Sequence, residues 1–283
     1  MRNLPRLLVW ALVVFLGACV LLVAAIVLAN RRFVSEARTL VGKANLATES
    51  VVTAAMLDGL PAPVQRYLTY TGVVGKPIAN TVRLEMEGRI RQEEDQPWMV
   101  FAADEFYTVS PPAFTWHAAT KIAGLPLVRV RDSYVEGTGG LQVSFAGLFS
   151  MSDARGADVD QGSLMRYLNE MMWFPTAYLG DNVSWEATDE QSARVTLTDR
   201  GATASAVVTF DEQGRLTNFI AERYANAGTP ESSLERWSTP ISAYGEFAGL
   251  RLPIAGSGVW HLAGGDLTYI ELEVTDVAYN VSQ

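Results

Sequence analysis

The sequence has few of the side chains from which most enzyme and metal sites are built. It contains one cysteine and two histidines among 283 residues. His117 and His261 each follow a tryptophan, and neither belongs to a cluster with metal-ligand spacing. No phosphate-binding, nucleophile-elbow or zinc-protease motif is present. We therefore expect no metal and no cofactor, and we interpret both histidines as ordinary strand residues.

Basic charge is also scarce. The net charge is −9, and with Arg2 and Arg6 set aside 20 basic residues remain against 31 acidic ones, a net charge of −11. This balance excludes the basic surface that nucleic-acid binding requires. The composition, 49% hydrophobic and 19% charged, excludes a disordered chain, and the length predicts one or two domains.

One long apolar run is present near the N-terminus. Leu7 to Ala29 contains no charged residue, and as a helix it would be roughly 35 Å long, enough to span a hydrocarbon core of about 30 Å. Leu16 to Cys19 resembles a lipoprotein cleavage site, which is the alternative interpretation. Because the run continues from Val20 to Ala29, we favour an uncleaved signal anchor, with Cys19 as an ordinary small residue inside it.

The anchor predicts a single-pass protein of the bacterial inner (cytoplasmic) membrane, attached through residues 7–29. Arg2 and Arg6 precede the span, and four basic residues follow it by Lys43, so the counts of basic residues leave the orientation open. We expect the domain on the extracytoplasmic side. The predicted organisation is an anchor over 1–30, a juxtamembrane helix or stalk of which no tertiary role is required over 31–58, and one domain over 59–283.

The domain begins with a short helix and then changes its period. Pro63 and Gly72 are typical of the first turn and the end of a helix. From Thr81 apolar and polar residues alternate, and the alternation returns along the chain between glycine-rich turns such as 137–140 and 264–266. The pattern predicts a mainly β fold with a large antiparallel sheet of about eleven or twelve strands.

One segment breaks this alternation. Asp160 is a candidate N-cap, apolar residues then recur at helical spacing, and Pro175 ends the pattern. We expect an amphipathic helix from Gln161 to Trp173 that packs on the sheet through its methionines, which adapt to varied apolar shapes.

Acidic residues before this helix offer a candidate catalytic cluster, and a pair of other carboxylates brought together by the fold is an alternative. A calcium loop that begins at Asp158 would need its glycine at position 163 and its glutamate at position 169, which are Ser163 and Asn169. Asp153, Arg155 and Asp158 could form a polar cluster for a carboxylate-dependent hydrolase, or a loop network of ion pairs. No catalytic residue is assigned, and the question of an enzymatic activity stays open.

Several motifs carry a resemblance to a bacterial family known only as a domain of unknown function. These motifs are Leu60–Leu68, Gln96–Met99, Asp153–Gly156, Trp173–Pro175 and Trp237–Pro240. The resemblance covers residues 60 to 280 and implies no activity.

A more distant resemblance concerns the C-terminal part. Phe210–Leu216, Tyr244–Pro253 and Asp276–Asn280 are similar to the end of the lipoprotein-carrier half-barrels, the LolA, LolB and RseB class. That class implies a curved antiparallel sheet that wraps a helix and leaves an apolar cavity. The predicted order of one helix, five strands, a central helix and further strands agrees with that class. The uncleaved anchor does not, because a lipoprotein carrier must leave the membrane.

The leading hypothesis is a membrane-anchored half-barrel that binds or senses a lipid or another hydrophobic molecule on its concave face. The alternatives are an interaction module with a closed core that meets a protein partner, and the hydrolase. The expected ligand-binding residues lie on the central helix and on the strands: Leu164, Met165, Leu168, Met171, Met172 and Trp173, with Trp116, Phe145, Trp185 and Trp260.

Overall fold

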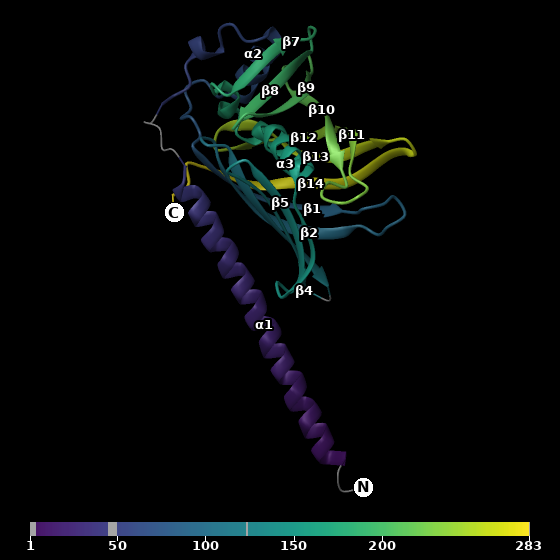
Figure 1. Ribbon diagram of the computed structural model, residues 1–283. Coiled ribbons are helices and arrows are strands. Elements are labelled where there is room, and N and C mark those ends of the chain that lie inside the picture. Colours follow the sequence, from purple (N-terminus) through teal and green to yellow (C-terminus); the bar gives the residue numbers. More distant parts are fainter. Residues whose placement is uncertain (1–3, 45–49, 123, 283) are drawn as a thin grey trace.

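The structure is a computed structural model that describes residues 4–44, 50–122 and 124–282. It consists of one strongly curved sheet, helices on both sides of it, and a long N-terminal helix that extends away from the domain (Figure 1). The helical segments are α1 (Leu4–Gly42), η1 (Ala54–Leu57), α2 (Ala62–Thr71), α3 (Ala157–Glu170), η2 (Met171–Trp173) and η3 (Pro175–Leu179). The strands are β1 (Thr81–Ile90), β2 (Met99–Thr108), β3 (Ala113–Ile122), β4 (Leu125–Val135), β5 (Thr138–Phe145), β6 (Phe149–Ala154), β7 (Val183–Ala187), β8 (Ser192–Asp199), β9 (Ala202–Phe210), β10 (Leu216–Ala225), β11 (Ser233–Ser238), β12 (Ile241–Phe247), β13 (Leu250–Leu262) and β14 (Gly265–Tyr279).

The strands form a single antiparallel sheet that curls into a half-barrel, so the predicted fold class is confirmed. Their order is β6-β5-β4-β3-β2-β1-β14-β13-β11-β10-β9-β8-β7, and β12 pairs with β13 outside this path. β1 and β14 pair along the length of β1, which joins the first and the last strand in the middle of the sheet. The sheet has more strands than expected because six rather than five precede α3, and because Pro240 separates β11 from β12.

The short helix α2 closes one end of the half-barrel. Pro63 lies in its first turn, and Gly72 ends it in the left-handed conformation with φ of 79°. Val64, Tyr67 and Leu68 are buried in the core. The sequence signals for this helix are confirmed.

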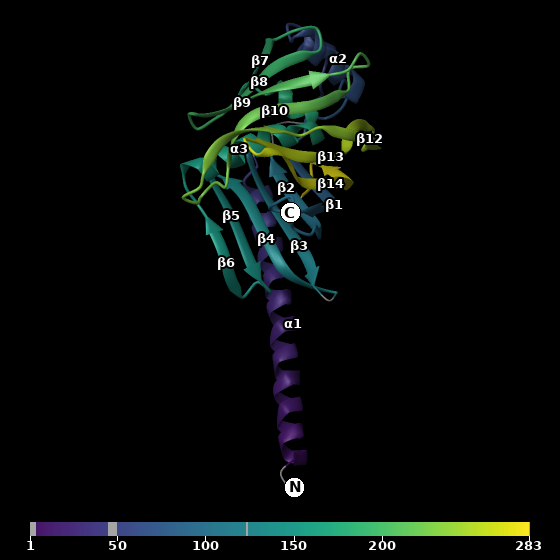
Figure 2. The same ribbon diagram turned by 90° about the vertical axis from the view of Figure 1, so that its right-hand side faces the viewer.

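Helix α3 lies inside the curved sheet (Figure 2), and nine of its 14 residues are buried. It begins at Ala157 rather than at Gln161, and Gly156 rather than Asp160 is its N-cap. Asp160 instead accepts a hydrogen bond of 2.7 Å from the backbone N–H of Gly139 on β5. An added Cβ at Gly139 would lie 2.6 Å from the carbonyl oxygen of Val159, so glycine permits the close approach of α3 to β5.

The C-terminal half of α1 packs on the outer face of the sheet, opposite to α3. Phe33 stacks on His117 of β3 with ring centroids 4.6 Å apart, and Glu36 forms an ion pair with Arg131 of β4. Asn30 accepts a hydrogen bond of 2.8 Å from Arg129. This part of the chain therefore has a tertiary role, which the sequence pattern did not require.

The N-terminal half of α1 projects beyond the domain, and its apolar side chains are exposed. Among the described residues, α1 is the one helix long and apolar enough to cross a membrane, by length and composition. A signal anchor and a signal peptide share these properties.

Candidate ligand-binding cavity

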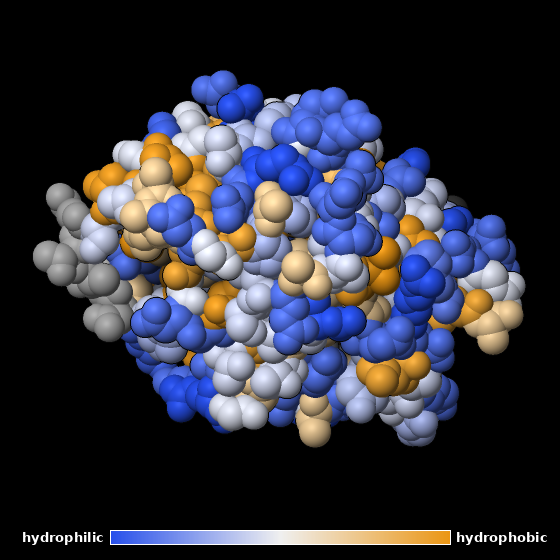
Figure 3. Space-filling view, turned by 90° about the horizontal axis from the view of Figure 1, so that it is seen from above, coloured by the Kyte–Doolittle hydropathy of each residue, from blue (hydrophilic) through white to orange (hydrophobic). Residues whose placement is uncertain are grey.

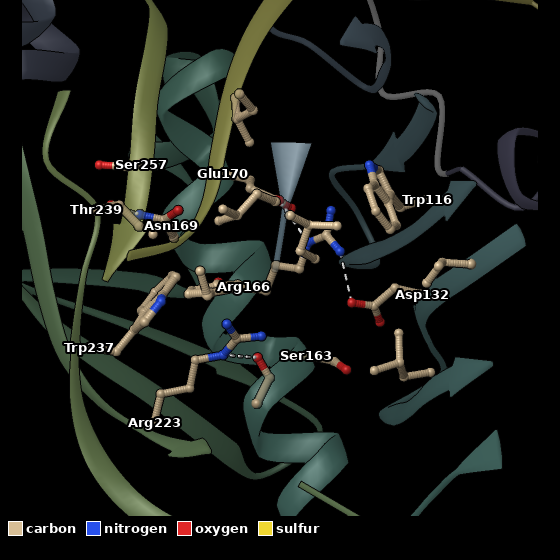
Figure 4. A pocket seen from close by; sticks show the side chains of 18 of the residues that line it. Trp116, Asp132, Ser163, Arg166, Asn169, Glu170, Arg223, Trp237, Thr239 and Ser257 are labelled. Atoms are coloured by element: carbon tan, nitrogen blue, oxygen red, sulfur yellow. Dashed lines mark hydrogen bonds and ion pairs between the residues drawn. The ribbon is translucent and has the colours of Figure 1, made fainter. Parts of the chain in front are cut away.

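A cavity of about 510 Å³ lies between α3 and the concave face of the sheet (Figure 4). Strands β1 to β6 contribute one side, and β10, β11, β13 and β14 contribute the other. The inner part of the cavity is lined by buried residues, which include Met86, Met172 and Trp237. Met99 and Leu141 are 40% and 36% exposed, and the cavity opens to solvent beside them. The volume is in the range of small-molecule sites, about 300–1,000 Å³.

The sheet side of the cavity is apolar. Trp116 lines it and packs edge-on against Phe101, with ring centroids 5.6 Å apart. The apolar lining residues come from neighbouring strands and include Met86, Ile90, Val128, Val130, Val143, Trp260, Ile270 and Leu272. A hydrocarbon chain on this surface would be removed from water at a gain of about 25 cal/mol per Å² of apolar area.

The helix side of the cavity is polar. Gly162, Ser163, Arg166, Asn169 and Glu170 of α3 line it together with one apolar residue, Val159, and all recur at the three- and four-residue spacing of one helix face. The apolar face of α3 points the other way, into a closed core. The cavity therefore has one apolar wall and one polar wall, the arrangement suited to an amphiphilic molecule.

A buried ion-pair cluster holds α3 to the sheet at this polar wall. The guanidinium of Arg166 lies 3.0 Å from Glu105, 2.8 Å from Asp132 and 2.7 Å from Glu170. It also lies over Trp116, 4.8 Å from the ring centroid. Burial raises the pKa of both Glu105 and Glu170, against the lowering effect of Arg166, because no solvent is present to stabilise their charge.

This cluster is a structural contact rather than a free catalytic pair. Asp132 and Glu170 are each bonded to Arg166, and Glu170 also accepts a hydrogen bond of 3.0 Å from Tyr107. In the part of the chain that the structure describes, neither histidine lines the cavity, and no three His, Cys, Asp or Glu side chains are placed to hold a metal ion.

A second polar group, here called the polar corner, consists of Arg223, Trp237, Asn169 and Thr239. Arg223 donates to the carbonyl oxygen of Gly162 at 3.2 Å and lies 4.7 Å from the ring centroid of Trp237. Among the described residues Arg223 has no ion-pair partner, and the buried Nε1 of Trp237 has no hydrogen-bond acceptor. Figure 4 shows both side chains on the same side of the cavity. The polar corner thus has spare donors for an acceptor brought by a ligand.

The structure brings only part of the predicted site together. Met172, Trp173, Trp116 and Trp260 line the cavity. Leu164, Met165, Leu168 and Met171 do not: they are fully buried in the core on the far side of α3. The apolar face of α3 is covered by the curled end of the sheet, which leaves the polar face toward the cavity.

The two remaining predicted residues also lie away from the cavity. Phe145 is exposed at the end of β5, and Trp185 on β7 packs against Tyr178 with ring centroids 5.4 Å apart. Arg166, Arg223 and Trp237 were not in the predicted set. Trp237 belongs to a motif that carried the family resemblance, whereas Arg223 lies in a strand without any distinguishing sequence signal.

The acidic cluster proposed for a hydrolase is not assembled. Arg155 pairs with Asp153 at 3.0 Å on the surface. Asp158 instead accepts hydrogen bonds from the N–H of Gly228, at 2.7 Å, and from Ser232, which holds the loop between β10 and β11. The pKa of Asp158 is lowered, first by the bond from Ser232. These contacts agree with the interpretation as a loop network.

Residues 50–272 match the sequence model of a family of unknown function, DUF6544. The chain belongs to this family. The motif resemblance to a domain of unknown function is therefore confirmed. No curated protein matches the chain significantly.

Two solved structures of low identity are similar to this member of the DUF6544 family. One is a domain assigned to outer membrane lipoprotein sorting in Vibrio parahaemolyticus, with a TM-score of 0.38, 10% identity, and coverage of 72% of this chain and 87% of that one. The other is a DUF1329 family protein from Desulfovibrio piger, with a TM-score of 0.41, 10% identity, and coverage of 83% and 95%.

Proposed function

We propose that the domain binds an amphiphilic molecule, a lipid or a molecule of similar build, in the cavity between α3 and the concave face of the sheet. The observation that carries this proposal is the cavity itself, which has an apolar wall on the strands and a polar wall on α3. An interaction module with a closed core would have no such cavity. In this domain the core is closed only on the side of α3 that faces away from the cavity.

The two walls suggest how the ligand lies. Its hydrocarbon part packs on the apolar strand residues around Val130 and Val143, where a gain of about 0.8 kcal/mol per buried methylene is expected. Its head group accepts hydrogen bonds from the guanidinium N–H groups of Arg223 that do not bond to Gly162, and from the Nε1 of Trp237, which has no other acceptor among the described residues. A carboxylate or a phosphate fits a guanidinium best.

We further propose that α1 keeps the domain at a membrane, with residues 1–30 as anchor. Its apolar half is exposed in the structure, and its length is sufficient for one span. The proposed location is the bacterial inner membrane, with the domain on the extracytoplasmic side. A reporter fused after Gln283 and active on only one side of the membrane tests this orientation.

Filling the cavity tests the binding proposal. Val130 and Val143 pair across β4 and β5, and both line the cavity. The full chain carrying Val130→Phe and Val143→Phe should bind a fluorescent fatty-acid probe about tenfold or more weakly, because the added rings occupy the space of the chain. The control is Val100→Phe, at an exposed position on β2 outside the cavity, which should bind like the wild type. Absence of probe binding by the wild type, or equal binding by all three proteins, would refute the proposal.

A further inference from the structure

Two neighbouring turns of the sheet are uncharged and expose apolar side chains. The turn between β3 and β4 lies in the uncharged segment 122–128, and the turn between β5 and β6 lies in the uncharged segment 143–152. Five large apolar side chains are exposed there, and we call them the apolar rim: Leu125, Phe145, Leu148, Phe149 and Met151. An exposed group of this kind marks a contact surface, since water does not favour it.

The apolar rim lies beside the membrane-length part of α1. At Gly147, in the turn between β5 and β6, an added Cβ would lie 2.6 Å from the Cβ of Ala29 and 3.9 Å from the carbonyl oxygen of Ala25. Ala25 and Ala29 belong to the last turns of the uncharged run. The close approach requires glycine and fixes this turn against the helix.

Strand β4 follows α1 in the same direction, which locates the other turn. Arg129 donates a hydrogen bond to Asn30, and one residue beyond the C-terminal ends of both elements Lys43 forms an ion pair with Glu136 at 2.8 Å. Leu125 precedes Arg129 by four residues, roughly 13 Å of strand. That distance equals about nine residues of helix, so Leu125 lies roughly level with Leu21, inside the apolar run. Figure 1 shows this end of β4 beside the middle of α1.

From this placement we propose that the apolar rim inserts into the membrane leaflet beside α1. The outer part of one bilayer leaflet is the expected occupant, because the apolar run of α1 ends at Ala29, beside Gly147, and the rim extends from that level into the span. The unpaired edge of β6 favours shallow insertion through side chains alone, since unpaired backbone groups are costly in hydrocarbon. By contrast, the turn between β1 and β2 carries Glu93, Glu94 and Asp95 and stays in water.

The rim also connects the bilayer to the cavity. Thr120, Val128, Phe145 and Phe149 are paired in register across β3, β4, β5 and β6, and therefore form one row on the same face of the sheet. Thr120 and Val128 line the cavity, whereas Phe145 and Phe149 belong to the rim. A lipid can thus pass from the leaflet into the cavity along this row. This second step rests on the proposed function, whereas the insertion itself does not.

Depth-dependent quenching in the full chain tests the insertion. Cys19→Ala removes the only cysteine, and Leu148→Cys then carries an environment-sensitive fluorophore in vesicles that contain spin-labelled lipids. The matched control is Val74→Cys, an exposed apolar position between α2 and β1. The end of the domain that carries α2 lies away from the rim (Figure 1), and seen from above its apolar patches are separated by hydrophilic side chains (Figure 3). We expect quenching by shallow spin labels at 148 and none at 74. Equal, water-like emission at both positions would overturn the proposal.

A charge on the rim tests the passage. Leu148→Asp with Phe149→Asp should slow uptake of a fluorescent fatty acid from vesicles about tenfold, and affinity for the same probe measured in detergent should not change. Val74→Asp should change neither quantity. If wild-type protein binds no probe, the proposed function fails while the quenching result still stands. If the probe binds and the rim charges do not slow uptake, the passage along the rim is wrong.

Discussion

Protonation of His117 should weaken the contact between α1 and the sheet. The imidazole stacks on Phe33 of α1 and lies 3.4 Å from Arg129, so a positive charge there would be buried beside another cation. Burial, and then Arg129, lower the pKa of His117 from its usual 6.5 to about 4, although Asp104 and Glu36 act in the opposite direction.

The sign and the size of the effect follow from this pKa. The pKa of His117 is lower in the folded chain than its value of about 6.5 in the unfolded chain. The free energy of unfolding is therefore highest above about pH 6.5 and falls as the pH drops toward about 4. At pH 5 the unfolded chain binds the proton and the folded chain mostly does not. The expected loss between about pH 7 and pH 5 is about 2 kcal/mol in the free energy of unfolding.

Urea unfolding of the full chain in detergent, followed by tryptophan fluorescence at the two pH values, measures this loss. His117→Phe keeps a ring against Phe33 and cannot titrate, so the difference between the wild type and this variant isolates the histidine from the carboxylates that titrate in the same range. We expect the wild type to lose about 2 kcal/mol more than the variant on acidification. An identical pH dependence of the two proteins would refute the reasoning.

Three further predictions concern α3 and the cavity. Arg166→Met leaves buried carboxylates without their counter-charge and should lower the free energy of unfolding by about 3–5 kcal/mol. Adding Glu105→Gln should restore part of this loss. A loss below about 1 kcal/mol for Arg166→Met in thermal unfolding would contradict the account. Gly139→Ala pushes α3 from β5 and should cost about 1–3 kcal/mol, whereas Gly264→Ala, with open space around its Cβ, should cost little in the same measurement. Arg223→Gln should weaken binding of a fatty acid by about 1.5–3 kcal/mol and leave its methyl ester unchanged in calorimetry, and equal losses for both ligands would argue against a head-group contact.

The sheet and its turns could be predicted because alternation directly reports a strand with one buried face. Runs such as Thr81 to Ile90 contain this information locally. The position of α3 inside the sheet followed from its apolar residues as well.

The face that α3 presents to the cavity could not be predicted in the same way. An apolar helix face is expected to meet whatever apolar surface is available, and only the curl of the sheet decides that Leu164 and Leu168 pack into the closed core. Arg166 then remains on the cavity side, where three carboxylates from α3, β2 and β4 make its burial tolerable. Such partners are distant in sequence, so no local pattern indicates them.

The contact of α1 with the sheet also depends on distant partners. Phe33 and Glu36 look like residues of an ordinary amphipathic helix, and their partners His117 and Arg131 look like exposed strand residues. Only the register of β3 and β4 brings these residues together. Because the sequence does not reveal this register, residues 31–42 look like a stalk that follows a membrane span.

The affinity of the full chain for saturated fatty acids of increasing length tests the central claim most directly. If the chain lies on the apolar wall, each added methylene should tighten the dissociation constant about fourfold, from about 0.8 kcal/mol per methylene, until the cavity is filled. The protein with Val130→Phe and Val143→Phe should reach this limit at a shorter chain. An affinity independent of chain length, or the same limit in both proteins, would contradict binding in the cavity.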